Sequence, residues 1–386
     1  MVDTATAAPA AKTGNGKAPV VALRPFITST FEIESHVYDN TTAALGAAPV
    51  ALNPYDVVTD GYLAGLYIWV VGTTAANAAA TTFVANGPWS VIQTVQFSDV
   101  SNRPIIGPMS GWELKECIKY GGYSFSDDPH NSTTYVATTG AGATGGSFEF
   151  ILHLPIEFVH KNALGALTNL SNAAVFRLEM TLAPLTQVYG VSPTTPPSVR
   201  VRVLQHGWME SNGKDARGRA AAATPLGVDT VQYWDKQTYA VNAGAQDSRF
   251  TAFEGQVRTL ILVYTDGAGS RTVGETNWPD PFRLRYDSVV PYDRFKIIWR
   301  RMMEEQYGYV GALDAANGKE NGVYVISWAR DFGLKVGAEQ GFGYLPVSSG
   351  TALRYSGSFG GAGTLTALWN YINPAGGNDL AITGGR

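Results

Sequence analysis

The stretch FEFILHL at residues 148–154 places a phenylalanine or leucine at every second position. Those side chains would share one face of a β-strand, and the residues between them would share the other. The same alternation returns in FRLEMTL at 176–182, VRVRV at 199–203 and FRLRY at 282–286. Such strands are typical of sheets with one buried and one solvated face. The sequence therefore predicts an all-β fold.

Two further strands are apolar on both faces, LYIWVV at 66–71 and LILVY at 260–264. We expect both at the centre of a sheet, buried on each side. The stretch 111–120 predicts a short helix, because Leu114, Cys117 and Ile118 lie on one helical face.

The stretch 293–302 predicts a second helix, with Asp293 as its N-cap. Ion pairs four residues apart are expected between Arg300 and Glu304 and between Arg301 and Glu305. The apolar stripe of this helix consists of Phe295, Ile298, Trp299 and Met302.

These features occur twice, in the same order along the chain. Each half has an apolar strand, a Trp next to a Pro, another strand, a Pro-containing turn, a helix closing in Tyr and Gly, a Gly-rich or Gly/Asn-rich loop and a further strand. We interpret this order as an internal duplication, with chance similarity as the alternative. The paired landmarks are 66–71 and 260–264, Pro88-Trp89 and Trp278-Pro279, Phe97 and Tyr286, 111–123 and 293–309, and Phe148 and Val323.

The chain has 386 residues, more than the roughly 250–300 that one hydrophobic core serves, so two domains are expected. We predict a flexible arm at 1–20, one unit at 21–190, a second at 191–372 and a flexible tail at 373–386. The Pro/Thr/Gly-rich segment Pro184–Pro197 would join the units.

Each unit has room for about eight strands with one short helix in an inter-strand loop. That count predicts two tandem eight-stranded jelly-roll β-sandwiches. A sandwich of immunoglobulin type is the competing fold, but its units of ~100 residues leave little room for a helix.

Charged residues make up only 16% of the chain, against about 25% in a typical protein, and the net charge is −4. A surface with few charges suits packing against neighbours, and no global positive field draws the chain to nucleic acid. The single cysteine, Cys117, excludes an intrachain disulfide and a multi-cysteine zinc site, as expected in a reducing compartment. The N-terminal segment lacks the pattern of a secretory leader, and the longest apolar run, 62–71, is too short to cross a bilayer.

With these paired landmarks, from about residue 21 to residue 372, the chain resembles the double jelly-roll major capsid proteins of tailless, membrane-containing double-stranded DNA phages of the tectivirus-like kind. The resemblance implies a non-enzymatic protein made in the host cytoplasm and found in the virion. It would form homotrimers, as pseudo-hexagonal capsomers, and tile an icosahedral shell around an internal membrane and the DNA genome.

The partners implied by the resemblance are other copies of the chain, minor capsid and vertex proteins, and the membrane through the N-terminal arm, without sequence-specific nucleic-acid binding. The loops 73–87 and 127–146 would face outward.

Several short motifs suit loops and cores better than chemistry. GAGATG at 140–145 matches a dinucleotide fingerprint but precedes a strand instead of a helix, and GNGK at 14–17 lacks the spacing of a phosphate loop. We expect Cys117 in the core. The aspartates 127, 128 and 280 are expected in turns.

His153 and Glu157 are expected on one solvent-facing side of their strand near His160, a weak candidate for a metal cluster. We predict no catalytic residue, no cofactor-binding residue and no metal ligand. Two other functions stay open: a virion spike or lectin-like carbohydrate-binding jelly roll, and a β-sandwich glycosidase with two converging carboxylates.

Overall fold

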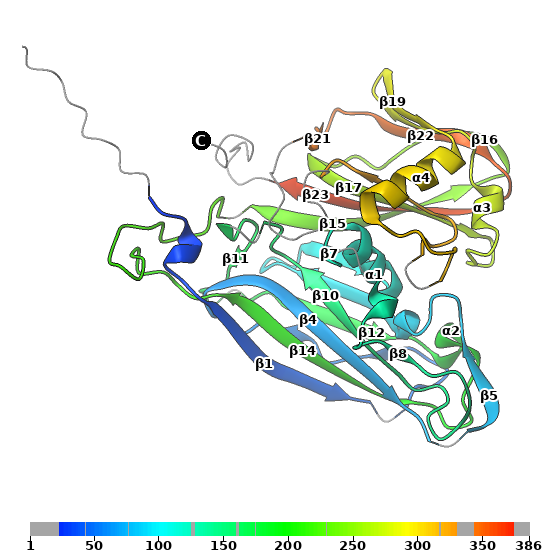
Figure 1. Cartoon of the computed structure of the whole chain (residues 1–386), viewed down its shortest axis with the longest axis horizontal. Helices are drawn as coiled ribbons and strands as arrows, with labels where there is room; N and C mark the ends of the chain where they lie inside the picture. Colours follow the sequence, from blue (N-terminus) through cyan, green and yellow to red (C-terminus); the bar gives the residue numbers. More distant parts are fainter. Residues whose placement is uncertain are drawn as a thin grey trace, which may run out of the picture.

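Two β-sandwiches follow one another along the chain, one in each half (Figure 1). The computed structural model describes residues 23–373 except 43, 76, 125–127, 160–161, 174, 229, 316–317 and 330–342. The expected arm at 1–20 and residues 374–386 of the expected tail lie outside this described part. Asn373, expected to begin the tail, ends the last strand instead.

The first sandwich contains two main sheets, a small sheet formed by β5, β9 and β13, and short 3₁₀ turns. Its strands are β1 (Glu32–Thr41), β2 (Val50–Ala51), β3 (Tyr55–Asp56), β4 (Tyr62–Thr73), β5 (Asn77–Phe83), β6 (Ile92–Ser98), β7 (Pro104–Met109), β8 (Val136–Ala137), β9 (Gly140–Gly142), β10 (Phe148–Pro155), β11 (Leu167–Thr168), β12 (Arg177–Leu182), β13 (Tyr189–Val191) and β14 (Ser198–Trp208), and its helices are α1 (Gly111–Tyr120) and α2 (Leu185–Val188).

The second sandwich contains fewer additions to its two main sheets. Its elements are β15 (Val231–Val241), β16 (Gly244–Arg249), β17 (Gly255–Asp266), α3 (Gly274–Asn277), β18 (Phe282–Tyr286), β19 (Val289–Arg294), α4 (Lys296–Tyr307), β20 (Val323–Ser327), β21 (Leu345–Val347), β22 (Leu353–Phe359) and β23 (Gly363–Asn373). None of the described helices is long and apolar enough to span a membrane.

Both sandwiches connect their strands in the same way. The first pairs them as β1-β14-β4-β10 and β2-β12-β6-β7, and the second as β15-β23-β17-β20 and β16-β22-β18-β19. Counted along each half, the order is first-eighth-third-sixth in one sheet and second-seventh-fourth-fifth in the other. This is the jelly-roll connection, and it confirms the predicted fold class. It also makes β4 and β17, α1 and α4, and β10 and β20 equivalent pairs, as the landmarks predicted.

The two sandwiches also share a sheet. Strand β7 of the first runs parallel to β15 of the second, with Ile106 opposite Trp234, so one sheet of each sandwich merges into a single ten-stranded sheet.

The change of sandwich lies later in the chain than predicted. Strand β14 follows the Pro184–Pro197 segment, yet it pairs with β1 and β4 of the first sandwich. The last strand of a jelly roll returns to the centre of its first sheet, so this Pro-rich segment is an internal loop. The expected boundary at residue 190 is therefore wrong, and we propose that the units meet within residues 209–230. The segments 73–87 and 127–146 were expected to be loops, but the structure shows strand β5 in the first and strands β8 and β9 in the second.

Helix α1 has the predicted bounds, and its first turn is fixed by reciprocal caps. The Ser110 hydroxyl accepts from the Glu113 backbone N–H at 3.2 Å, and the Glu113 carboxylate accepts from the Ser110 N–H at 2.7 Å.

Helix α4 differs from its prediction at its start. It begins at Lys296, and Asp293 belongs to β19, where it pairs with Arg283 at 3.0 Å. The Lys296 N–H donates instead to Asp280 Oδ1 at 2.9 Å, so the cap comes from a turn distant in sequence.

The side-chain pairs of α4 were predicted in part. The Arg301–Glu305 pair is confirmed at 3.0 Å, whereas Arg300 pairs with Glu275 and Glu304 with Lys319. Of the apolar stripe, only Trp299 is buried.

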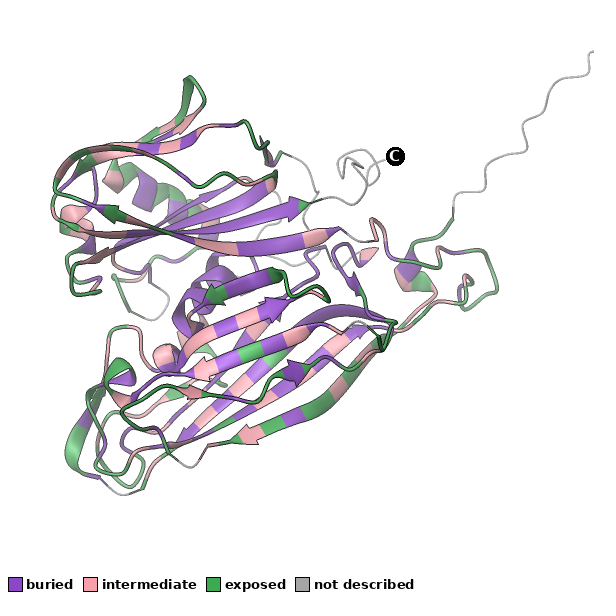
Figure 2. Cartoon of the chain, turned by 180° about the vertical axis from the view of Figure 1, so that it is seen from behind, coloured by how far each residue is buried: buried purple, intermediate pink, exposed green. Residues whose placement is uncertain are grey.

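Burial distinguishes the two strands that were expected to be apolar on both faces. β17 is buried on both sides, as predicted, but β4 alternates, with Tyr67 exposed and Trp69 half-buried. Figure 2 shows this as stripes along the strands of the first sandwich and nearly continuous burial in the central strands of the second.

The cap of α4 can be tested by comparing two aspartates. Asp280→Ala leaves the Lys296 N–H without its acceptor, so we expect the free energy of unfolding to fall by about 1 kcal/mol. Asp293→Ala removes only an exposed ion pair and should cost less than about 0.5 kcal/mol. Urea unfolding of both variants measures the difference, and a larger loss for Asp293→Ala would contradict this assignment of the cap.

Candidate functional site at the contact between the two sandwiches

Helix α1 lies between the sandwiches (Figure 1). It packs on β10 of its own sandwich and on β17 of the other, and all ten of its residues are buried. Burying a helix on every side also buries its charged side chains, which then need partners. The residues concerned are Glu113, Lys115, Glu116 and Lys119.

Glu320, from the loop before β20, provides the main partner. Its Oε1 accepts from Lys115 Nζ at 2.6 Å and from Lys119 Nζ at 2.8 Å, and its Oε2 accepts from the Tyr120 hydroxyl at 2.6 Å. One carboxylate of the second sandwich thus binds three donors on one helix of the first.

The two ammonium groups have further acceptors close by. Lys115 Nζ lies 2.8 Å from Glu116 Oε1, and Lys119 Nζ lies 2.6 Å from both Asp128 Oδ2 and the Gly318 carbonyl oxygen. These charged side chains are almost completely excluded from solvent. Two cations therefore face three carboxyl groups in a buried cluster, which we call the joint cluster: Lys115, Glu116, Lys119, Asp128 and Glu320.

The carboxyl groups of the joint cluster respond differently to this environment. Burial and the negative charge of Glu320 raise the pKa of Glu116 to about 7. Burial also disfavours the charge of Glu320, but the ammonium groups of Lys115 and Lys119 hold its pKa well below the usual value. For Asp128, hydrogen bonding from His130 and the charge of Lys119 outweigh burial and lower the pKa to about 2. Glu116 is therefore the carboxyl group of the joint cluster that takes up a proton most readily.

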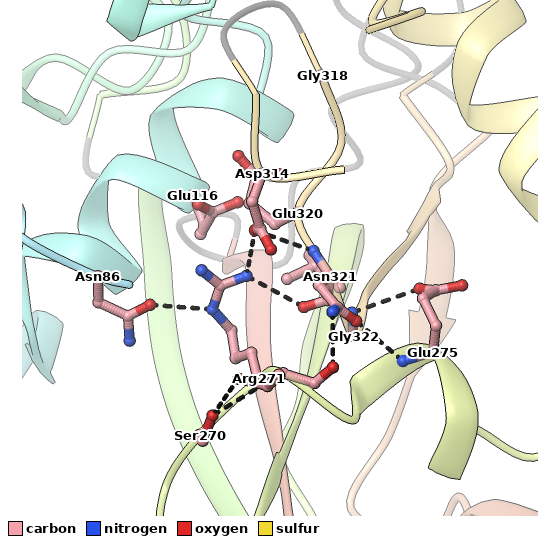
Figure 3. A network of polar contacts seen from close by, with 12 residues as sticks. Asn86, Glu116, Ser270, Arg271, Glu275, Asp314, Gly318, Glu320, Asn321 and Gly322 are labelled. Atoms are coloured by element: carbon pink, nitrogen blue, oxygen red, sulfur yellow. Dashed lines mark hydrogen bonds and ion pairs between the residues drawn. The ribbon is translucent and has the colours of Figure 1, made fainter. Parts of the chain in front are cut away.

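A second set of bridges surrounds Arg271 of the second sandwich (Figure 3). Its Nε donates to Asn86 Oδ1 of the first sandwich at 2.9 Å, and its Nη1 donates to Asp314 Oδ1 at 2.7 Å. The guanidinium group also lies over the ring of Trp112, 4.6 Å from its centre, at the start of α1. At the neighbouring strand β15, Lys236 Nζ pairs with Glu113 Oε1 of α1 at 2.7 Å.

This arrangement is suited to fixing the position of α1, and with it the first sandwich, against the second. A buried ionic cluster contributes little net stability but strongly disfavours geometries in which its charges lose their partners. Charged partners at Glu320, Arg271 and Lys236 hold α1 at several points, so the two sandwiches have one relative orientation. We infer that the contact is a rigid joint between two similar lobes.

The motifs singled out in the sequence lie outside this joint or have structural roles. Residues 140–142 form β9 and a turn leads on to β10, so GAGATG precedes a strand as expected, but half of it is itself a strand instead of a loop. Cys117 is buried with its Sγ 3.9 Å from Met109 Sδ, and burial raises the pKa of its thiol. The GNGK stretch at 14–17, Asp127 and His160 lie outside the described residues.

The predicted neighbourhood of His153 and Glu157 is wrong. β10 ends at Pro155, and Glu157 turns inward, where it accepts from Trp208 Nε1 at 2.6 Å. His153 stacks on Tyr67 at 4.5 Å, and burial together with His206 lowers its pKa to about 3. In the part of the chain that the structure describes, no group of three His, Cys, Asp or Glu residues could hold a metal ion.

The joint cluster itself was not predicted. Lys115, Glu116 and Lys119 looked like the solvated side of an amphipathic helix, and nothing near Glu320 in sequence indicates its role. Asp128 and Asp280 were correctly expected in turns, where they accept from the backbone N–H groups of His130 and Lys296. Asp128 has the additional bond to Lys119.

Removing Glu320 tests the joint cluster. Glu320→Ala leaves two buried ammonium groups short of acceptors, so we expect a loss of about 3–5 kcal/mol in the free energy of unfolding. Glu305→Ala is the matched control, because Glu305 pairs with Arg301 on the surface and should contribute less than about 1 kcal/mol. Equal losses in urea unfolding at neutral pH would contradict the role of Glu320.

The pKa of Glu116 predicts a dependence on pH. With a folded pKa of about 7 against an ordinary 4.5, the folded chain binds more protons than the unfolded chain between those values. The stability due to this group therefore falls as the pH rises through that window. Glu116→Gln stays neutral, so its free energy of unfolding relative to wild type should rise by about 2 kcal/mol from pH 5 to pH 8. A difference that is constant with pH would show that Glu116 is ionised throughout.

No protein-family model and no curated protein matches the chain in sequence. Solved structures do match its fold. The crystal structure of the STIV MCP, from Sulfolobus Turreted Icosahedral Virus, is 11% identical with a TM-score of 0.58 and covers 89% of this chain and 97% of that one. The PBCV-1 virus capsid model is 12% identical with a TM-score of 0.55 and covers 89% and 94%.

The major capsid protein P2 from bacteriophage PM2 is 7% identical with a TM-score of 0.52 and covers 90% of this chain and 100% of that one. In each case the likeness covers both sandwiches and nearly the whole of the other chain. The chain therefore has the double jelly-roll fold found in viral major capsid proteins.

Proposed function

We propose that the chain is the coat subunit of a virus and builds a shell from copies of itself. The observation that carries this proposal is the repeated sandwich: two jelly rolls with one connection order, held together by a buried joint. The fold shared with viral capsid proteins supports the same role.

The repeat has a direct geometric consequence for assembly. Three chains around one axis present six similar lobes, so a trimer has a nearly hexagonal outline and can tile a facet with one gene product. This works only if each chain is stiff, since lobes that swivel would not present a constant outline. The joint cluster and the Arg271 bridges supply that stiffness.

The finer features of the proposal rest on the resemblance seen in the sequence. The shell would be icosahedral and enclose a membrane and a double-stranded DNA genome, with the segment 1–20 contacting the membrane and minor proteins at the vertices. Subunits would be made in the host cytoplasm. The role is structural and requires no catalytic site.

A carbohydrate-binding role is the second candidate, and one observation favours it. The outer face of β4 carries Tyr67 and Trp69 beside Arg202 and Glu149, an aromatic platform with polar groups around it. Aromatic rings of this kind stack on sugars. Binding to a glycan array by a chain that stays monomeric would support this candidate against the coat subunit.

Light scattering on the purified full chain tests the coat proposal. We expect particles of three times the chain mass of 41.2 kDa, with a hexagonal outline in negative-stain electron microscopy. Raising the protein concentration should favour larger, sheet-like assemblies of these particles. A chain that stays monomeric at every concentration would sink the proposal.

A further inference from the structure

Equivalent strands of the two sandwiches differ in how far they are buried. In the second sandwich β17 and β20 are buried on both faces, and β23 is buried on both faces over most of its length. In the first sandwich β4, β10 and β14 alternate between buried positions and positions that are half-buried or exposed. Because the connection order is the same, the difference must come from what lies on the outer face of each sheet.

The first sandwich covers this face of the second, through α1 and through the end of β10 and the residue after it. Residues Lys236, Leu368, Ile261 and Val325 stand opposite one another across β15, β23, β17 and β20. Lys236 of this row pairs with Glu113 of α1, and α1 packs on β17. The row therefore faces the first sandwich.

The equivalent row of the first sandwich is covered less completely: among the described residues His36 and Tyr67 are exposed, and Leu204 and His153 are half-buried. His36, Leu204, Tyr67 and His153 stand opposite one another across β1, β14, β4 and β10. A surface cavity of about 420 Å³ lies over this face, with Tyr67 38% exposed and Ile151 37% exposed. We call this surface the β4 face: His36, Tyr67, Trp69, Ile151, Arg202 and Leu204.

The equivalent of α1 is open as well. Helix α4 packs on β20 as α1 packs on β10, but of its predicted apolar stripe only Trp299 faces the core. Phe295 and Ile298 are each 54% exposed and Met302 is 37% exposed, and nothing in the described part of the chain covers them. Three exposed apolar side chains along one side of the helix and its N-cap residue, Phe295, indicate a contact surface. We call them the α4 stripe.

The sheet edges show the same asymmetry. β7, the fifth strand of the first sandwich, lies beside β15, the first strand of the second. Their equivalents are β19 and β1, and among the described strands each has one neighbour only, β18 and β14 respectively. Inside the chain, then, the helix and fifth strand of one sandwich meet the first sheet of the next. The equivalent helix and fifth strand of the second sandwich, α4 and β19, and the equivalent first sheet of the first sandwich make no contact of this kind in the described part of the chain.

We propose that the α4 stripe docks on the β4 face of a second copy of this chain, repeating between chains the contact that α1 makes within one. The proposal rests on the proposed self-assembly and names the surfaces that carry it. Each chain would use a different surface toward each neighbour, so the contact is head-to-tail and forms a closed ring when the rotation between copies permits. Apolar burial is the main driving force on both surfaces.

Two exposed substitutions test the pairing. Ile298→Asp places a charge in the α4 stripe, and Ile151→Asp places one on the β4 face, and both positions are open enough for the chain to fold. Each variant alone should need at least about tenfold more protein to associate than wild type. Val191→Asp is the control, since Val191 is 48% exposed in β13 and belongs to neither surface. Circular dichroism and thermal unfolding check the fold of all three.

An equimolar mixture of the two variants distinguishes head-to-tail pairing from other contacts. The Ile298→Asp chain keeps an intact β4 face, and the Ile151→Asp chain keeps an intact α4 stripe. The mixture should therefore form a species of two chains, which neither variant forms alone, and it should stop there. Analytical ultracentrifugation measures the three samples.

The outcomes separate this inference from the coat proposal. Trimers formed equally well by both variants would overturn the docking surfaces and leave the coat proposal standing. Variants that fail alone and also fail when mixed would overturn head-to-tail pairing. A monomeric wild type whose glycan binding is lost in Ile151→Asp would overturn both, because the β4 face would then serve a carbohydrate.

Discussion

The orientation of the two sandwiches depends on one carboxylate. Glu320 enters from the second lobe and binds both ammonium groups and the phenol that α1 presents. Without it, the helix would bury two cations against a smaller negative charge. Any shift of the lobes that separates Glu320 from the two ammonium groups would leave buried charges unpaired and raise the free energy. The cluster therefore selects one geometry even though its net contribution to stability is small. The Arg271 and Lys236 bridges add points of attachment along the same helix.

The strand pattern and the repeat could be predicted because both depend on residues close together in the sequence. The alternation in 148–154 and 176–182 assigns the apolar side chains of each strand to one face of its sheet. The spacing of Leu114, Cys117 and Ile118 identifies helix α1 in the same way. The boundary at 190 could not be found this way. A Pro/Thr-rich loop has the same composition whether it joins domains or strands, and only the pairing of β14 with β1 and β4 decides between them.

The joint cluster was beyond local prediction for a related reason. Lys115 and Lys119 have the composition of a solvated helical face, and they are buried only because a partner some 200 residues away covers them. The cap of α4 is similar: Asp293 is of the favoured residue type but lies in β19, two residues before the N-cap Phe295, and Asp280 accepts from the Lys296 N–H because the β18–β19 hairpin brings it there. In both cases the deciding contact is formed by the tertiary fold.

The duplicated chain carries an asymmetry that a single sandwich would not have. The contact between the two lobes uses helix α1 of the first and the sheet face around β17 of the second. Helix α4 and the β4 face, which are their equivalents, remain without such a contact inside the described chain. All the charged side chains of α1 are buried and paired, whereas α4 buries Arg300, keeps the Arg301–Glu305 pair on the surface and leaves Phe295, Ile298 and Met302 exposed. An exposed apolar stripe costs free energy in water, and a burial pattern that alternates in β4 but not in β17 leaves room for a cover. Both features have one physical explanation if the surface that remains on each chain is completed by the next.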